Sequence, residues 1–165
     1  MARVYISVGS NIDRERNIDM ALRLLEASFG QLQRSSVYES EAIGFDSDPF
    51  YNLVVGFDTD DTPREIHDVL HCIEEASGRI RTTGLSARTL DLDLLLYDDL
   101  VTETGGLVLP RDDITRYAFV LAPLAEIAGT LRHPVTGENY ENLWSAFDEA
   151  GQVLSRVDWP PATAP

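Results

Sequence analysis

The sequence RTLDLDLL at residues 88–95 alternates leucine with aspartate in the manner of a β-strand. Because successive side chains of a strand point to opposite faces, Asp91 and Asp93 share one face while the leucines face a core. Two neighbouring carboxylates repel each other unless a cation neutralises them. Mg²⁺ suits this pattern, since it commonly binds one or two carboxylates and completes its shell with phosphate oxygens. With Arg88 available to a phosphate, the stretch predicts a magnesium–nucleotide site at a strand edge.

A plainer interpretation of the same stretch is a solvated strand face that carries two acids without a metal. An Asp-x-Asp motif is short and occurs often by chance. The leucines on both sides of the pair favour the metal site, because a buried strand seldom holds acidic side chains without a partner.

The size and composition of the chain indicate one globular domain. Its 165 residues are 44% hydrophobic, which suffices for a sizeable core. We expect the domain to span residues 1–150 and the proline- and alanine-rich residues 151–165 to form a flexible tail. No apolar stretch has the length of a membrane span, and Cys72, the single cysteine, excludes an internal disulfide. These features predict a cytoplasmic protein, with Cys72 as a small core residue on a helix.

The charge of the chain bears on its partners. The formal net charge is −15, and such a field repels nucleic acid and anionic membranes, so neither is an expected partner. ATP would be repelled as well, unless arginines or a metal reverse the local sign. Arg79, Arg81 and Arg88 lie within ten positions of one another beside the Asp pair, which supplies such a local reversal.

Apolar periodicity and turn residues predict the order of the elements. Strands are expected at residues 3–8, 32–38, 51–58 and 89–97, with a short one at 107–109; helices are expected at 13–28, from Thr62 onward, and at 115–127 with an interruption at Pro123; loops are expected at 39–49 and 79–87. Thr62 and Glu65 can form a capping box at the start of the second helix. The order βαββαβ predicts a ferredoxin-like α+β fold, an antiparallel sheet with helices packed on one face.

Five pieces of this chain, in order, resemble one family, the 6-hydroxymethyl-7,8-dihydropterin pyrophosphokinases of the folate pathway. The pieces are Tyr5-Ile6-Ser7-Val8-Gly9-Ser10-Asn11, Phe50-Tyr51-Asn52-Leu53-Val54, Glu74 with Gly78-Arg79 and Arg81, residues 88–95, and Phe119-Val120-Leu121-Ala122-Pro123-Leu124. The resemblance runs from about residue 4 to about residue 128 and implies a ferredoxin-like fold. It also implies Mg²⁺-dependent transfer of pyrophosphate from ATP to the hydroxymethyl group of a reduced pterin, with release of AMP.

The resemblance also implies roles for the residues around the Asp pair. Asp91 and Asp93 would hold two Mg²⁺ ions that bridge the phosphate oxygens and the hydroxymethyl oxygen. One ion can lower the pKa of that hydroxyl, so that no separate base is required. Arg79 and Arg88 would stabilise charge on the group being transferred. A plain surface cation near the C-terminus of a helix is the alternative for Arg79.

On the pterin side, the flat substrate with its amide-like edge requires stacking and paired hydrogen bonds. Asn52 offers a carbonyl and an amide to that edge, Phe119 would stack on one face, and Ser40, Ile43 and Gly44 would complete the pocket. An ordinary core phenylalanine and a buried, satisfied amide are the alternatives for Phe119 and Asn52.

On the nucleotide side, the resemblance implies contacts from His71, Glu74, Arg81, Arg111 and Arg116. Glu74 would accept hydrogen bonds from adenosine or ribose hydroxyls, and an exposed helix carboxylate is its alternative. His71 stands where the family has a glutamine that faces adenine.

The departures from the family pattern lie mainly on the nucleotide side. Leu85-Ser86-Ala87 stands in place of Trp-Gly-Pro in the covering loop, and Pro110-Arg111-Asp112 stands in place of a Pro-His-Tyr triplet whose His contacts ATP. Tyr117 stands in place of an arginine, with Arg116 one place earlier. On the pterin side, Glu41 replaces a proline.

Because of these departures, two other interpretations stand beside that of a working pyrophosphokinase. One is a paralogue that phosphorylates a different pterin or binds a pteridine without turnover, and the other is a small acidic interaction module.

Overall fold

The computed structural model describes residues 1–41, 48–78 and 90–159. In chain order its elements are β1 (Ala2–Ser10), α1 (Arg14–Phe29), β2 (Gln33–Arg34), β3 (Val37–Ser40), β4 (Phe50–Thr59), α2 (Pro63–Ala76), β5 (Asp91–Tyr97), α3 (Asp113–Arg116), α4 (Ala118–Ala128), α5 (Tyr140–Ser145) and β6 (Leu154–Val157). The predicted order βαββαβ is confirmed. The whole of the predicted loop 79–87 lies outside the described residues.

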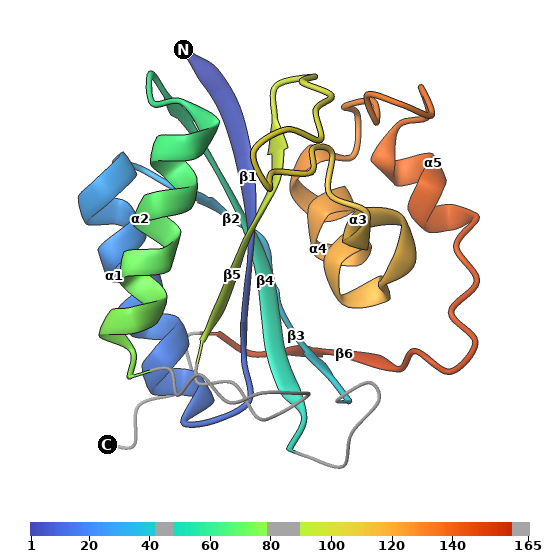
Figure 1. The fold of residues 1–165 in the computed structure, drawn as a ribbon. Coiled ribbons are helices and arrows are strands. Elements are labelled where there is room, and N and C mark those ends of the chain that lie inside the picture. The colour runs from blue at the N-terminus through green and yellow to red at the C-terminus, as the bar shows by residue number, and fades with distance from the viewer. Residues whose placement is uncertain (42–47, 79–89, 160–165) are drawn as a thin grey trace.

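The strands form one antiparallel sheet in the order β5-β1-β4-β3-β6, with β2 beside β4 (Figure 1). Strands β1 and β4 pair over their whole lengths, from Ala2 opposite Thr59 to Ser10 opposite Tyr51. The neighbouring strands β5-β1-β4-β3 follow the order of a ferredoxin-like sheet. In that order the first and third strands of the βαββαβ unit, here β1 and β4, are central. The last strand of the unit, β5, is therefore an edge strand, and it carries the Asp pair.

Helices α1 and α2 cover one face of the sheet (Figure 1). The apolar residues of β1 and β5 on that face, such as Ile6 and Leu92, pack with Ile18 of α1 and Ile66 of α2 in the main core. The start of α2 is fixed as predicted, because Thr62 accepts a hydrogen bond from the backbone N–H of Glu65 and the Glu65 carboxylate accepts one from Thr62.

The opposite face of the sheet is also covered, which the βαββαβ pattern alone did not predict. Helices α4 and α5 pack there in a second apolar cluster that includes Tyr5, Val54, Leu121 and Tyr140 (Figure 1). The predicted interruption at Pro123 is wrong, since α4 continues through it. The ring removes one backbone hydrogen bond, but the helix is almost wholly apolar and its burial against the sheet holds it together.

Four further predictions need correction. The strand expected at 32–38 is split into β2 and β3, because Ser35 turns its hydroxyl into the ladder and accepts the backbone N–H of Val54 at 2.9 Å. The region expected as a tail contains β6, which pairs with β3 and extends the sheet. Cys72 is exposed on α2 instead of buried. The short strand expected at 107–109 is a single bridge between Thr102 and Leu109. No helix of the described ranges is both long and apolar enough to cross a membrane.

Candidate functional site

The register of the sheet aligns the predicted pterin-binding and metal-binding residues. Gly9 of β1 lies opposite Asn52 of β4 on one side and opposite Asp91 of β5 on the other. One step along, Ser7 lies opposite Asp93. Because directly opposed residues of a sheet point to the same face, Asn52, Gly9 and Asp91 form one row on the face that α4 covers. The amide of Asn52 thus lies two strands away from the two carboxylates, although at least 39 positions separate it from them in the sequence.

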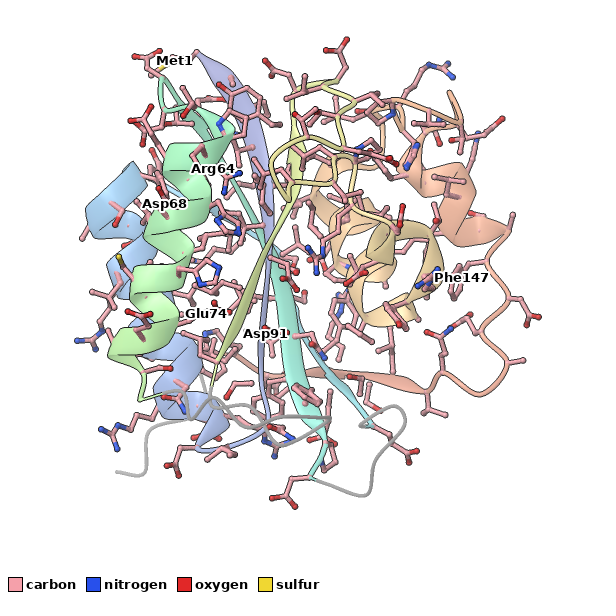
Figure 2. The ribbon with its side chains drawn as sticks, in the orientation of Figure 1. Met1, Arg64, Asp68, Glu74, Asp91 and Phe147 are labelled. Atoms are coloured by element: carbon pink, nitrogen blue, oxygen red, sulfur yellow. The ribbon has the colours of Figure 1, made fainter. Side chains whose placement is uncertain are left out.

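The Asp pair sits in an electrostatically strained setting. The Asp93 side chain is only 25% exposed. Burial, and then the negative charge of Asp91, raise the pKa of Asp93 from its ordinary 3.8 to about 7. Because its ionised form is disfavoured, Asp93 would be stabilised by a bound divalent cation. Figure 2 shows Asp91 on β5. The predicted common face of the two acids is confirmed, and it is not a freely solvated strand face.

Arg111 is the cation that faces Asp93 within the described residues. Its terminal nitrogen lies 3.3 Å from the Asp93 carboxylate, and its Nε donates to the Asp113 carboxylate at 3.3 Å. Burial opposes charge on Arg111, but these two carboxylates outweigh it and raise its pKa above the ordinary value. The structure therefore places Arg111 directly beside the Asp pair.

A pocket of ≈ 330 Å³ lies between α2, β5 and the segment that follows β5. It contains most of the predicted nucleotide-binding side chains that the structure describes. One wall holds His71 and Glu74 of α2, and the other holds Arg111; the floor is formed by Asp91 and Asp93. The segment from Gly106 to Leu109 supplies a third, mainly apolar wall. The pocket thus combines carboxylates, a guanidinium group and apolar side chains in its lining.

Glu74 differs from the exposed carboxylate that was its alternative interpretation. It is only 4% exposed, and its Oε2 accepts the backbone N–H of Leu92 at 2.9 Å. Figure 2 shows Glu74 reaching from α2 toward β5. Its Oε1 lies 3.7 Å from Nδ1 of His71. Glu74 therefore ties α2 to the strand that carries the Asp pair, whatever else it binds.

The residues predicted to bind the pterin are arranged around Asn52. The residue is 6% exposed, and its amide nitrogen donates to the Ser40 hydroxyl at 2.7 Å, so the two predicted pocket residues are in contact. The carbonyl oxygen of the amide points at Gly9, where a Cβ would stand 3.0 Å from it. Phe119 is half-buried at the start of α4 and stacks on Tyr117, with ring centroids 5.0 Å apart. The row therefore contains an oriented amide, and the aromatic pair Tyr117–Phe119 lies at the start of the helix on the same face of the sheet.

The remaining predicted residues are not brought into this arrangement by the described structure. Arg79, Arg81, Arg88, Ile43 and Gly44 lie outside the described residues. Arg116 is exposed at the end of α3 and is not among the described residues that line the pocket. Its role stays a prediction.

Two titratable residues of the pocket were not predicted from the sequence. His67 lines the pocket one helical turn before His71, and the two rings meet edge to face with centroids 4.6 Å apart. Asp113 lines the pocket and pairs with Arg111. The spacing of four between the histidines places them on one helix face and was a usable signal. Nothing in the sequence around Asp113 marked it: it is the first residue of α3, and its partner Arg111 lies in the irregular segment before that helix.

The donor set fits magnesium better than a metal held by protein alone. In residues 1–41, 48–78 and 90–159 no group of three or more His, Cys, Asp or Glu side chains is arranged to hold a metal. A pair of carboxylates suits Mg²⁺ when phosphate oxygens and water fill its other positions.

Comparison with known proteins points to one family. Residues 5–129 match the family model of 7,8-dihydro-6-hydroxymethylpterin-pyrophosphokinase (HPPK). A 2-amino-4-hydroxy-6-hydroxymethyldihydropteridine pyrophosphokinase of Methylorubrum extorquens is 36% identical over 162 residues, which cover 96% of this chain and 100% of the relative. A Bacillus subtilis protein of the same name is 38% identical and is covered to 81%.

The chain also matches larger proteins, of which it spans only a part. The chain is 34% identical to the folic acid synthesis protein fol1 of Pneumocystis carinii but spans 18% of its length. Among solved structures, the wild-type HPPK-DHPS of Plasmodium falciparum with SDX-DHP aligns with a TM-score of 0.67 at 16% identity, covering 88% of this chain and 43% of that one. At that identity the structural likeness shows the fold alone.

Proposed function

Since the chain belongs to the 7,8-dihydro-6-hydroxymethylpterin-pyrophosphokinase family, we propose that its sheet row carries out the pyrophosphate transfer of that family. The activity is ATP-dependent transfer of pyrophosphate to 6-hydroxymethyl-7,8-dihydropterin in folate synthesis, with Mg²⁺ as the metal. In this reaction the hydroxymethyl oxygen bonds to the β-phosphorus of ATP. The bond from that phosphorus to the oxygen shared with the α-phosphate breaks, the hydroxyl proton is lost, and AMP leaves.

The observation that carries the site assignment is the row Asn52–Gly9–Asp91. Strands in a sheet lie about 4.8 Å apart, so two strand spacings separate the amide from the carboxylate by about 10 Å. A pterin anchored by its amide-like edge at Asn52 spans that gap, with its hydroxymethyl arm toward the Asp pair. Gly9, without a side chain, leaves the middle of the row open.

Each residue of the row then has a distinct task. Asn52 reads the pterin edge with the Ser40 hydroxyl fixing its orientation, and Phe119 stacks on the ring. Asp91 and Asp93 hold two Mg²⁺ ions. When bound, Mg²⁺ neutralises phosphate charge and makes the substrate hydroxyl more acidic. The support for the pair is its burial and mutual repulsion, since a carboxylate kept from water by its surroundings is stabilised by a cation.

The pocket on the α2 side takes the nucleotide in this proposal. Arg111 donates to phosphate oxygens, and the His71 side of the pocket takes the base. Arg79, Arg81, Arg88 and Arg116 complete the set as predictions from the sequence, as do Ile43 and Gly44 for the pterin. The exclusion of nucleic acid, based on the net charge of −15, and the cytoplasmic location stay predictions in the same sense.

AMP release by the purified protein with ATP, Mg²⁺ and 6-hydroxymethyl-7,8-dihydropterin tests the proposal, against the same mixture without the pterin. Asp91→Asn and Asp93→Asn should each remove pterin-dependent AMP release, while Asp99→Asn, an exposed acid on the turn after β5, should not. Pterin binding measured by calorimetry should persist in Asp93→Asn, because Asn52 lies two strands away. Tight pterin binding by the wild type with no AMP release would instead favour the paralogue that binds a pteridine without turnover.

A further inference from the structure

One guanidinium group connects the Asp pair to a third carboxylate. Two separate nitrogens of Arg111 are engaged, a terminal nitrogen with Asp93 and Nε with Asp113, at 3.3 Å each. The Arg111 side chain is 38% exposed and that of Asp113 is 29% exposed, and both line the pocket. Asp113 and Arg111 are two residues apart, so their contact is local and does not depend on β5. The Asp93 contact, by contrast, crosses from one segment to another.

These two contacts respond differently to a metal. A cation bound at Asp93 carries the same sign as the guanidinium and uses the same carboxylate, so Arg111 and the metal compete for Asp93. Asp113 takes no part in that competition, because its contact is with Nε at the stem side of the group. The fork of an arginine allows one nitrogen to stay bound while another exchanges its partner.

We propose that Arg111 is a counter-ion that changes partner: in the metal-free protein it neutralises Asp93, and when metal and nucleotide enter it pivots on Asp113 and donates to the phosphates. Asp113 is then a positioning residue that acts through Arg111. The inference rests on the proposed function, since it needs a metal at Asp93 and a phosphate in the pocket.

The exchange has opposite effects on the affinities for a free divalent cation and for the nucleotide. With no nucleotide present, Arg111 weakens the binding of a free divalent cation, because the cation must displace it from Asp93. With nucleotide present, Arg111 strengthens binding, because the displaced nitrogens meet phosphate oxygens. A residue that only supports the fold would change both affinities in the same direction, or neither.

Titration calorimetry on the full chain separates these possibilities. The two probes are Mg²⁺ alone and Mg²⁺ with α,β-methylene-ATP, which cannot lose AMP. Arg111→Gln should bind Mg²⁺ alone about fivefold more tightly than wild type and the nucleotide about tenfold more weakly. Arg23→Gln is the matched control, since it removes the same charge from an exposed position on α1, where Arg23 is 78% exposed. It should change neither affinity by more than about twofold.

Asp113 is tested through its dependence on Arg111. Asp113→Asn should weaken nucleotide binding several-fold in the wild-type background and have no effect on it in Arg111→Gln, because there is then nothing to position. Arg111→Lys, which keeps the charge but loses the fork, should fail to restore nucleotide affinity and should provide a folded variant if the glutamine does not fold.

Several results would overturn the inference. Weaker binding of both probes by Arg111→Gln, or an equal effect of Asp113→Asn with and without Arg111, assigns these residues to structural support alone. If wild type releases AMP with pterin and the affinities do not change in opposite directions, the inference fails while the proposed function stands. If opposite changes appear without any AMP release, the exchange stands and the proposed function fails.

Discussion

Replacement of Asp93 by asparagine should remove a loss of stability that the metal-free protein suffers as the pH rises. Asparagine has nearly the size of aspartate but does not ionise, so the comparison isolates one charge. The native pKa of Asp93 is about 7, against an ordinary 3.8. A carboxyl group with a raised native pKa binds its proton more tightly in the folded state, so its contribution to stability falls as the pH rises from about 4 to about 7.

The size of the effect follows from the two values. With a pKa of about 7 folded and 3.8 unfolded, ionisation of Asp93 costs the native state about 2 kcal/mol at pH 5 and about 4 kcal/mol at pH 8. The free energy of unfolding of wild type should therefore fall by about 2–3 kcal/mol relative to Asp93→Asn over that range. Titrating groups that do not interact with Asp93 contribute equally to both proteins and cancel in the difference.

Urea unfolding with a chelator present, at pH 5, 6, 7 and 8, measures this difference. Asp91→Asn provides a second check, since loss of the neighbouring charge should lower the pKa of Asp93 and flatten the wild-type dependence. Asp99→Asn, exposed on the turn after β5, should keep the wild-type dependence. A difference between wild type and Asp93→Asn that stays constant from pH 5 to pH 8 would refute the reasoning, because it would show that Asp93 titrates as it does in the unfolded chain.

Three further changes test other parts of the structure. Gly9→Ala would place a Cβ 3.0 Å from the Asn52 carbonyl oxygen, so KM for the pterin should rise about tenfold with KM for ATP unchanged; equal changes in both would contradict the row. Glu74→Ala leaves the Leu92 N–H without its carboxylate and should lower the free energy of unfolding by about 1–3 kcal/mol in urea titration, whereas unchanged stability would mean that Glu74 serves ligands alone. Thr62→Ala removes the cap of α2 and should cost about 1 kcal/mol, or about 2–4 °C in Tm by calorimetry, with kcat unaffected; a larger loss of kcat than of stability would be inconsistent with a capping role.

The local pattern of the sequence predicted most of the helices and strands. The alternation at residues 90–95 marked β5 and the common face of its two acids, and the Thr62–Glu65 capping box marked the start of α2 to the residue. Both features depend on residues a few positions apart, where side-chain geometry repeats with the backbone. The resemblance then linked five such pieces to one family, which the comparisons confirm.

Local pattern failed where distant packing decides the outcome. Pro123 reads as a helix breaker, yet α4 persists because the sheet buries it. The residues near 150 read as a tail, yet β6 pairs with the free edge of β3. In each case an interaction with a residue far away in the chain outweighs the local preference, and no short window of sequence contains both partners.

The sequence by itself therefore predicted the residues of the site, a pair of carboxylates on one strand and an amide on another, and it indicated the pyrophosphokinase family. Only the tertiary structure decided how they meet. The register of β1 set Gly9 between Asn52 and Asp91, burial at the sheet edge raised the pKa of Asp93, and the fold of the segment after β5 brought Arg111 and Asp113 against it. Distance, burial and charge coupling are properties of side chains gathered from remote positions, and they exist only once the sheet has formed.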